Sequence, residues 1–437
     1  MSFVLVNPED GFTSDVIKDS RRFVGRADLV ENCISALNAS VGLIAVYGKR
    51  GVGKSSLLRQ IQKMATGDYN IAQKAGLYHL IPPAPKRYYT VYYQCDSLIQ
   101  DAKDLFLRLC NDTDQEDGLL RLVPDKGKEV VEFSRGEEAN VGQDLKVVKW
   151  GAKGTDSEKY AHRVPNDTVQ SFRNFVTSVV LHNNSFWSKR DSVLIVLDEF
   201  DQIQDKAGLG SIIKSLSSPT VKFAVCGIGA DLSALMEDHA SVGRLVQQGS
   251  LHVKPMDRGE VRAIFSTAKA LFKDRIDFNQ DVIDKIADIC EGYPYFAQLI
   301  GKSCVEEGNR VGRNKIDGPI LHAVLNKIRN GEAFPNLERS YSRAVGHSED
   351  RASLLALLAE QSENESILDP SGSYVRLKEI RGIAKDLDVS HVDQNLPRLL
   401  EAQYGPVLTK DPDRQGVYEF VDPVFRAYVR LRKIGYG

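Results

Sequence analysis

The sequence predicts an α/β fold with a parallel β-sheet, because short apolar runs alternate along the chain with segments of helical periodicity. Each run is preceded and followed by turn-forming or charged residues. Short, continuous apolar runs of this kind are typical of strands that are buried on both faces of a sheet. A glycine-rich turn follows the first run, and two acids follow the third. The four runs lie at residues 41–47, 88–93, 193–197 and 222–226.

Length and charge restrict the classes of protein to which the chain can belong. Its 437 residues suffice for two to four domains. With 57 basic and 59 acidic residues the formal net charge is −2, so any nucleic-acid surface would be a local patch. The six cysteines form no CxxC pair, and no run approaches the roughly 18 apolar residues of a membrane span. We therefore expect a cytoplasmic protein with reduced thiols and no membrane contact.

The first strand lies in the setting that a phosphate-binding loop requires. Apolar residues at helical spacing predict a helix over 26–37 and another over 57–64, on either side of the strand and its glycine turn. A further helical pattern over 169–180 precedes the third strand. Strand, glycine turn and helix in this order bring backbone N–H groups to a helix N-terminus, where they can hold phosphates.

Changes of pattern along the chain predict four parts. Residues 1–20 form an N-terminal arm, and 21–255 form the sheet-based core. A charged insertion at 112–165, with strand-like pieces near 129–133 and 145–150, interrupts the core, and we expect it to be a solvated surface excursion or a partner contact. Residues 256–340 are helical and form a lid. The remainder, 341–437, is a separate domain.

This last part has the pattern of a winged helix. Three helical stripes begin at Leu354, Leu377 and Val392. Two strand-like segments follow, Val407–Thr409 and Val417–Phe420, separated by a turn rich in Asp, Pro and Gly. Three helices followed by a hairpin make a winged helix.

The segment Gly48–Ser55 matches the phosphate-loop pattern GxxxxGK[ST] in full. Its glycines allow successive backbone N–H groups to point inward at the phosphates. Lys54 would reach the β- and γ-phosphates, and the Ser55 hydroxyl would complete a Mg²⁺ shell, so ATP or ADP with Mg²⁺ is the expected ligand. The nucleotide-binding residues predicted here are Gly48, Arg50, Gly51, Val52, Gly53, Lys54, Ser55 and Ser56.

Two acids, Asp198 and Glu199, end the third strand. A buried parallel strand delivers its carboxyl end to the ligand crevice, so these acids would face the phosphates. Asp198 is expected to orient Mg²⁺, directly or through water, and Glu199 to polarise the attacking water. Lys54, through its contact with the phosphates, is the second expected catalytic residue. In isolation the two acids could equally be a solvated turn, but the phosphate loop favours the functional interpretation.

These motifs together resemble the AAA+ superfamily, in particular the STAND and archaeal-type ATPases related to the origin-recognition initiators. Gly48–Ser55 and Leu197–Glu199 match its two nucleotide motifs. Phe23–Arg26 resembles the box on the adenine side, and Gly292–Pro294 resembles the GxP motif of STAND lids. The stretch 239–244 resembles the segment that supplies an arginine after the fourth strand.

The resemblance implies three further site residues, each with a structural alternative. Arg26 would contact the nucleotide, or else only solvate a helix start. Pro294 would lie near the nucleotide, or else be an ordinary first-turn proline. Arg244 would act as an arginine finger on a neighbouring subunit of a homo-oligomer, or else pair with a nearby acid.

The sequence departs from the family pattern at the sensing positions. Cys226 and Gly227 stand where the first sensor is usually polar, and the lid has no convincing second-sensor arginine. We therefore expect slow hydrolysis of ATP to ADP and phosphate, as suits a molecular switch that controls assembly or an effector partner, for example in prokaryotic defence or DNA transactions. One alternative is an initiator-like protein that binds DNA through 376–433. Another is a scaffold that holds nucleotide with little turnover.

Overall fold

The computed structural model describes residues 5–39, 43–111, 118–119, 130–135, 145–150, 161–163, 172, 176, 190–227, 249–361, 374–387, 389–411 and 414–433. The chain divides into two compact units. The sheet unit comprises Ala27–Tyr47 and Lys54–His252. The helical unit comprises Met1–Arg26, Gly48–Gly53 and Val253–Gly437. The predicted boundaries at 20, 255 and 340 stay predictions.

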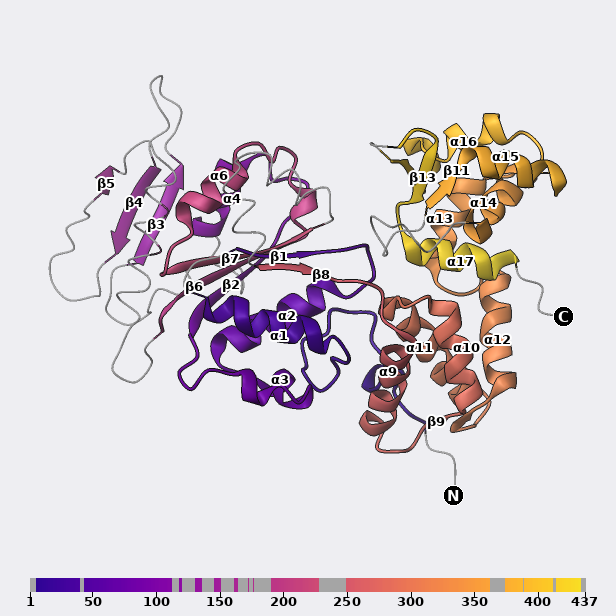
Figure 1. Ribbon diagram of the computed structural model, residues 1–437, viewed down its shortest axis with the longest axis horizontal. Coiled ribbons are helices and arrows are strands. Elements are labelled where there is room, and N and C mark those ends of the chain that lie inside the picture. Colours follow the sequence, from indigo (N-terminus) through magenta and orange to yellow (C-terminus); the bar gives the residue numbers. More distant parts are fainter. Residues whose placement is uncertain are drawn as a thin grey trace. The chain divides into compact units, whose positions relative to one another are not determined.

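The sheet unit is built on five parallel strands in the order β2-β6-β7-β1-β8 (Figure 1). The predicted parallel α/β fold is confirmed, and β8 is a fifth strand beyond the four expected. The elements of this unit are α1 (Ala27–Asn38), β1 (Leu43–Tyr47), α2 (Lys54–Thr66), α3 (Asn70–Lys74), β2 (Tyr88–Gln94), α4 (Ala102–Asn111), β3 (Val130–Arg135), β4 (Leu145–Trp150), β5 (Ala161–Arg163), β6 (Ser192–Asp198), α6 (Leu209–Leu216), β7 (Val221–Gly227) and β8 (Ser250–His252).

Both faces of this sheet are covered, which explains why every residue of β6 and β7 is buried. Side chains alternate between the faces. Ile195, Leu197 and Val225 belong to a core cluster that also contains residues of α4 and α6. The intervening residues face α1 and α2, which lie on the other side of the sheet (Figure 1). By this alternation Asp198, which follows Leu197, lies on the α2 side.

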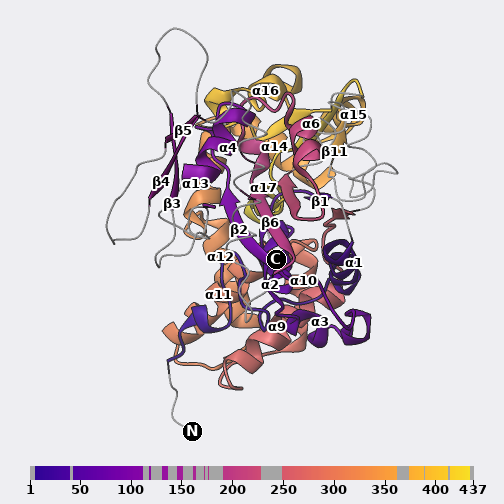
Figure 2. The ribbon, with the colours of Figure 1, turned by 90° about the vertical axis from the view of Figure 1, so that its left-hand side faces the viewer.

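The predicted insertion at 112–165 contains a small antiparallel sheet in the order β3-β4-β5. Two of its strands correspond to the expected strand-like pieces, with β3 running to Arg135 and β5 additional. The sheet lies beside α4 in both views (Figure 2). The rest of the insertion lies outside the described residues.

The helical unit contains the lid and the winged helix. Its elements are α9 (Arg258–Leu271), β9 (Asp277–Phe278), α10 (Gln280–Cys290), α11 (Pro294–Arg310), β10 (Lys315–Ile316), α12 (Gly318–Arg329), α13 (Pro335–Val345), α14 (Glu349–Gln361), β11 (Tyr374–Arg376), α15 (Leu377–Asp386), α16 (Val392–Arg398), β12 (Leu408–Lys410), β13 (Val417–Phe420) and α17 (Pro423–Lys433). Within the described residues, no helix combines the length and apolar character that crossing a membrane requires.

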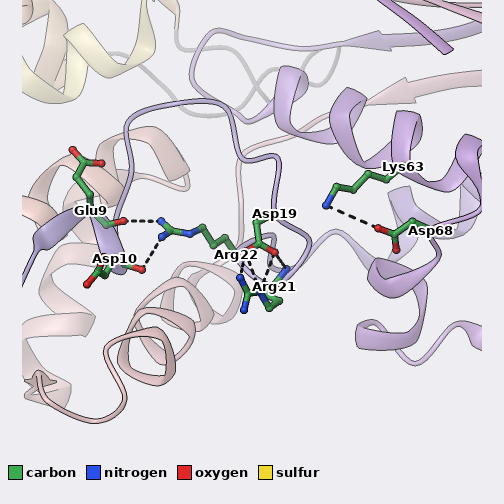
Figure 3. A network of polar contacts seen from close by, with 7 residues as sticks. All are labelled: Glu9, Asp10, Asp19, Arg21, Arg22, Lys63 and Asp68. Atoms are coloured by element: carbon green, nitrogen blue, oxygen red, sulfur yellow. Dashed lines mark hydrogen bonds and ion pairs between the residues drawn. The ribbon is translucent and has the colours of Figure 1, made fainter. Parts of the chain in front are cut away.

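The N-terminal segment packs on the lid. Phe12 is fully buried, and its ring lies 5.4 Å from that of Phe265 and 5.6 Å from that of Phe278. Figure 3 shows the Arg22 guanidinium donating to the carbonyl groups of Glu9 and Asp10, at 2.9 and 2.8 Å. These contacts fold the segment back on itself before the chain enters α1.

The predicted winged helix is confirmed. Helices α14, α15 and α16 are followed by the hairpin β12–β13, and β11 adds a third strand in the order β11-β13-β12. Pro397 lies inside α16, which is only seven residues long. The final helix, α17, packs against α12, α13 and α14, and so joins the winged helix to the lid.

Candidate nucleotide-binding site

Within the sheet unit, the described metal and catalytic candidates lie at the start of α2 and at the carboxyl end of β6. Lys54 and Ser55 are the first two residues of α2, and Ser56 follows them. Asp198 is the last residue of β6 and pairs in register with Gln94 at the end of β2. The N-terminus of a helix and the carboxyl ends of parallel strands are both features that favour binding of phosphate groups.

Asp198 is buried and its two carboxylate oxygens are both engaged. It is 4% exposed. The hydroxyl of Tyr92 donates to Oδ2, and the backbone N–H of Glu199 donates to Oδ1 at 2.9 Å. A carboxylate with a donor on each oxygen has a fixed orientation, as an acid that orients a metal ion requires.

Glu199 has contrasting surroundings. It is exposed, and its carboxylate accepts from Gln94, whose Nε2 donates to Oε2 at 3.1 Å. Its backbone is left-handed, with φ 53° and ψ 39°. A non-glycine residue in this region is strained by about 1 kcal/mol or more. This left-handed conformation turns the chain sharply after β6, and the carboxylate is accessible to water.

The pKa values of two neighbours reflect the buried setting of Asp198. Burial raises the pKa of Tyr92, and the charge of Asp198 and the hydrogen bond to it raise it further. Burial also raises the pKa of the Cys226 thiol well above its usual value. Asp198 adds to that second shift through its charge and a hydrogen bond, while Lys54 opposes it. Cys226, Lys54 and Asp198 are therefore electrostatic neighbours.

The glycine part of the phosphate loop belongs to the helical unit. Gly51 has φ +78°, and a Cβ placed on it would lie 2.7 Å from Val424 Cγ2 of α17. Only glycine combines this conformation with this close approach. A Cβ at Gly53 would lie 3.8 Å from the ring of Pro294. The loop therefore contacts both the lid and the winged helix.

Two basic residues of the loop face acids of the winged helix. Lys49 Nζ lies 2.5 Å from Glu419 Oε2 on β13. Burial raises the pKa of Asp422, and the nearby Arg50 guanidinium lowers it. Sequence reasoning missed this pairing, because the acids lie some 370 positions further along the chain than the loop.

Arg26 is buried and holds the phosphate loop by its backbone. Its Nη2 donates to the carbonyl oxygen of Val52 at 3.1 Å. Its own N–H donates to Glu260 of α9 at 2.7 Å, and its φ is 63°. The arginine thus ties the lid to the loop, and its expected contact with nucleotide stays a prediction.

Pro294 begins α11 directly after a turn that forms ion pairs with α17. Glu291 at the end of α10 is 2.7 Å from Arg426 Nη1 and also pairs with Arg430. Arg426 is 2% exposed. The predicted GxP motif, Gly292–Pro294, is therefore flanked by an ion-paired contact to the winged helix. Arg244 lies outside the described residues.

The five parallel strands lie in the order β8-β1-β7-β6-β2, with a phosphate loop after β1 and two acids after β6, which is the setting of a P-loop nucleotide site. The family model of the novel STAND NTPase 1 proteins matches residues 11–294. The chain belongs to this family. It is therefore a nucleotide-binding P-loop NTPase, and the resemblance to the STAND group of AAA+ ATPases is confirmed.

Several solved structures are similar to this STAND NTPase. The Drosophila ORC bound to DNA is 10% identical, with 98% of this chain and 91% of that chain covered and a TM-score of 0.41. Cdc6p from Pyrobaculum aerophilum is 12% identical, with coverages of 98% and 99% and a TM-score of 0.43. The Aeropyrum pernix ORC1 protein in complex with DNA is 11% identical, with coverages of 96% and 93% and a TM-score of 0.43. The comparison with curated proteins finds no match.

The residues of this STAND NTPase fit a nucleotide with magnesium. A Cβ at Gly48 would meet the carbonyl group of Val253, so the loop keeps a conformation in which its amides, not side chains, line the turn. Lys54 supplies the cation, and Ser55 and Asp198 supply the oxygen donors that Mg²⁺ prefers. Bound magnesium would neutralise phosphate charge there.

Proposed function

We propose that this STAND NTPase binds Mg·ATP, hydrolyses it slowly and works as a switch whose winged helix rests on the phosphate loop in the closed state. The observation that carries the proposal is the contact of Gly51 and Lys49 with Val424 and Glu419. A domain that covers the loop must move for nucleotide to exchange freely. Nucleotide state and the position of the winged helix are therefore coupled.

The charges explain which nucleotide favours opening. Glu419 and Asp422 are acids beside the loop, where they pair with or lie near Lys49 and Arg50. A triphosphate brings more negative charge to the same loop than a diphosphate. The triphosphate competes with the two acids for Lys49 and Arg50, and its charge repels the acids. Such charge interactions reach a few kcal/mol at partly buried sites. ATP therefore favours release of the winged helix, and ADP favours the closed state.

Released surfaces then become available for assembly. In the ATP state the winged helix and the covered loop both lose their intramolecular partner. We propose that a homo-oligomer forms in this state, with Arg244 acting on the neighbouring subunit, and that an effector partner responds to it. Hydrolysis, with Glu199 polarising the water and Lys54 and Ser55–Asp198 holding phosphate and Mg²⁺, restores the closed form.

The rate of ADP release tests the closed state. Glu419→Gln removes the acid from its partly buried pair with Lys49, whose side chains are 18% and 23% exposed. Loss of such a pair costs about 1–2 kcal/mol, so release of fluorescently labelled ADP should be about tenfold faster, measured by stopped flow. The particle mass with ATP should shift toward the assembled form at lower protein concentration.

The matched control is Glu379→Gln. Glu379 also pairs with an arginine of the winged helix, Arg376 at 3.2 Å, but both side chains are about half exposed, so this pair contributes little. This variant should release ADP at the wild-type rate. Equal release from Glu419→Gln and wild type would show that the winged helix does not restrain the loop.

A further inference from the structure

We propose that Tyr92 is a positioning residue for the metal carboxylate, and that binding of the magnesium–nucleotide pair depends on its hydroxyl. The inference rests on the proposed role of Asp198 at the Mg²⁺ ion. Tyr92 lies on β2, which carries none of the predicted nucleotide motifs, and nothing in its local sequence distinguishes it from the other tyrosines of Tyr88–Gln94.

Strand register brings the hydroxyl to the carboxylate. β2 and β6 are parallel neighbours in which Gln94 pairs with Asp198 and Tyr92 pairs with Val196. Paired residues share a face, so Tyr92 lies diagonally behind Asp198 on the α2 side. A diagonal separation is within reach of a long aromatic side chain, and the Tyr92 hydroxyl donates to Asp198 Oδ2.

The direction of this hydrogen bond follows from the two groups. Tyr92 is 2% exposed, and its hydroxyl carries the proton that an ionised carboxylate lacks, so the phenol is the donor and the carboxylate the acceptor. The other oxygen, Oδ1, accepts from the backbone of Glu199. With each oxygen held by one donor, Asp198 keeps its rotamer and still offers lone pairs to a metal-bound water or to Ser55.

The ring of Tyr92 also contacts α2, the helix that follows the phosphate loop. The Arg59 guanidinium on α2 lies 3.3 Å from the ring centroid. Lys54 and Ser55 begin the same helix. The ring is therefore packed between the helix that carries the phosphate-binding residues and the strand that carries the acid, and it fixes the acid relative to that helix.

Cys226 lies beside the carboxylate on the other neighbouring strand. It stands near the end of β7, and it is an electrostatic neighbour of Asp198. This position is where the family usually has a polar first sensor. A thiol is a weak donor, so the Tyr92 hydroxyl is the side-chain donor on which the inference depends.

A pair of tyrosine variants tests the role of the hydroxyl. Tyr92→Phe removes it and keeps the ring, whereas Tyr93→Phe changes the next residue of β2, which is also buried but belongs to the core cluster on the opposite face. Calorimetry would measure ADP affinity with MgCl2 and with EDTA. We expect Tyr92→Phe to lose about tenfold in the magnesium-dependent gain of affinity, with EDTA values unchanged and Tyr93→Phe like wild type.

The variant Asp198→Asn and an electron paramagnetic resonance measurement distinguish a role of Tyr92 at the metal from a general effect on ADP binding. Asp198→Asn should remove the gain, and adding Tyr92→Phe to it should change nothing further. Mn²⁺ in place of Mg²⁺ should give an altered electron paramagnetic resonance spectrum in the Tyr92→Phe complex with ADP. Weaker ADP binding by Tyr92→Phe in EDTA as well, or an undiminished gain, would overturn the inference. If wild type itself gains nothing from magnesium, the proposed function fails instead.

Discussion

At the scale of single residues, the two neighbouring acids of the site have opposite surroundings. Asp198 is buried and held by Tyr92 and by a backbone amide, whereas Glu199 is exposed and accepts from Gln94. A metal carboxylate needs a fixed orientation, and an acid that polarises water needs access to it. The two acids thus have the two settings that their proposed roles require, because the strand ends between them.

Replacing the exposed acid separates turnover from binding. Glu199→Gln should lower the rate of phosphate release by about 10²-fold or more, because the amide cannot polarise water, while Mg·ATP affinity stays within about twofold. The ATP-bound assembly should persist longer in mass photometry. The control is Asp205→Asn, which changes an acid six positions along whose carboxylate only caps the N–H of Ala207. Unchanged turnover in Glu199→Gln would favour the inert scaffold.

The site residues differ in how far sequence reasoning could find them. The phosphate loop and the two acids follow fixed spacings that physics imposes on phosphate binding, so they were predictable. Tyr92 was not, because aromatic residues are common in any strand. Lys49 and Glu419 were not, because their pairing depends on how the winged helix packs, which no local pattern encodes.

At the scale of elements, one buried acid joins two helices of the lid. Glu307 on α11 is 2% exposed. It accepts from Lys327 of α12 at 2.9 Å and pairs with Arg310 one turn along its own helix. The hydrogen bond from Arg310 and the contact with Lys327 together lower the pKa of Glu307 to about 2, against the opposing effect of burial.

This ion pair should make the lid sensitive to acid. Because the folded pKa lies below the unfolded value of 4.5, Glu307 contributes stability above pH 4.5, and that contribution is lost as the pH falls toward 2. Glu307→Gln should lower the free energy of unfolding at pH 7 by about 1–3 kcal/mol and reduce its change between pH 6 and pH 3. Urea unfolding measures both.

The adjacent Glu306→Gln is the control, since Glu306 is exposed on the same helix. It should leave the unfolding curves within about 0.5 kcal/mol of wild type at either pH. An identical pH response in wild type and Glu307→Gln would contradict the assignment.

The elements that sequence patterns predicted are those with long periodic or continuous apolar runs. The strands β1, β2, β6 and β7 and the three winged-helix helices are of this kind. The strand β8 has three residues, of which only Leu251 is buried, so it carries no run to recognise. The lid strands β9 and β10 have two residues each, and β11 has three. Such pieces form because neighbouring elements offer partners, which is a tertiary effect.

At the scale of the whole molecule, the basic residues of the C-terminal part act mostly within the chain. Arg426 and Arg430 pair with Glu291, and Arg432 pairs with Glu338 of α13. In the winged helix, Arg381 pairs with Asp393 and Arg414 with Asp411. The cluster that suggested a DNA surface therefore holds the winged helix to the lid and stabilises its own fold.

DNA binding should accordingly be weak in the closed state. The expected dissociation constant for a 20-base-pair duplex with ADP present is above about 10⁻⁶ M, because the acids paired with these arginines compete with DNA phosphates for them. Fluorescence anisotropy at 50 and 150 mM salt should give a slope of log K against log salt of magnitude below about 2. A slope near −6 would instead indicate an extensive phosphate footprint and favour the initiator-like alternative. Neutralising Arg381, paired with Asp393, should leave the slope unchanged.

The left-handed backbone of Glu199 sets two demands on this chain against each other. Glycine at that position would relieve about 1 kcal/mol of strain. Glu199→Gly should therefore raise the melting temperature, and it should abolish turnover if the residue polarises water as proposed. Thermal stability and chemistry would then make opposite demands on one backbone position.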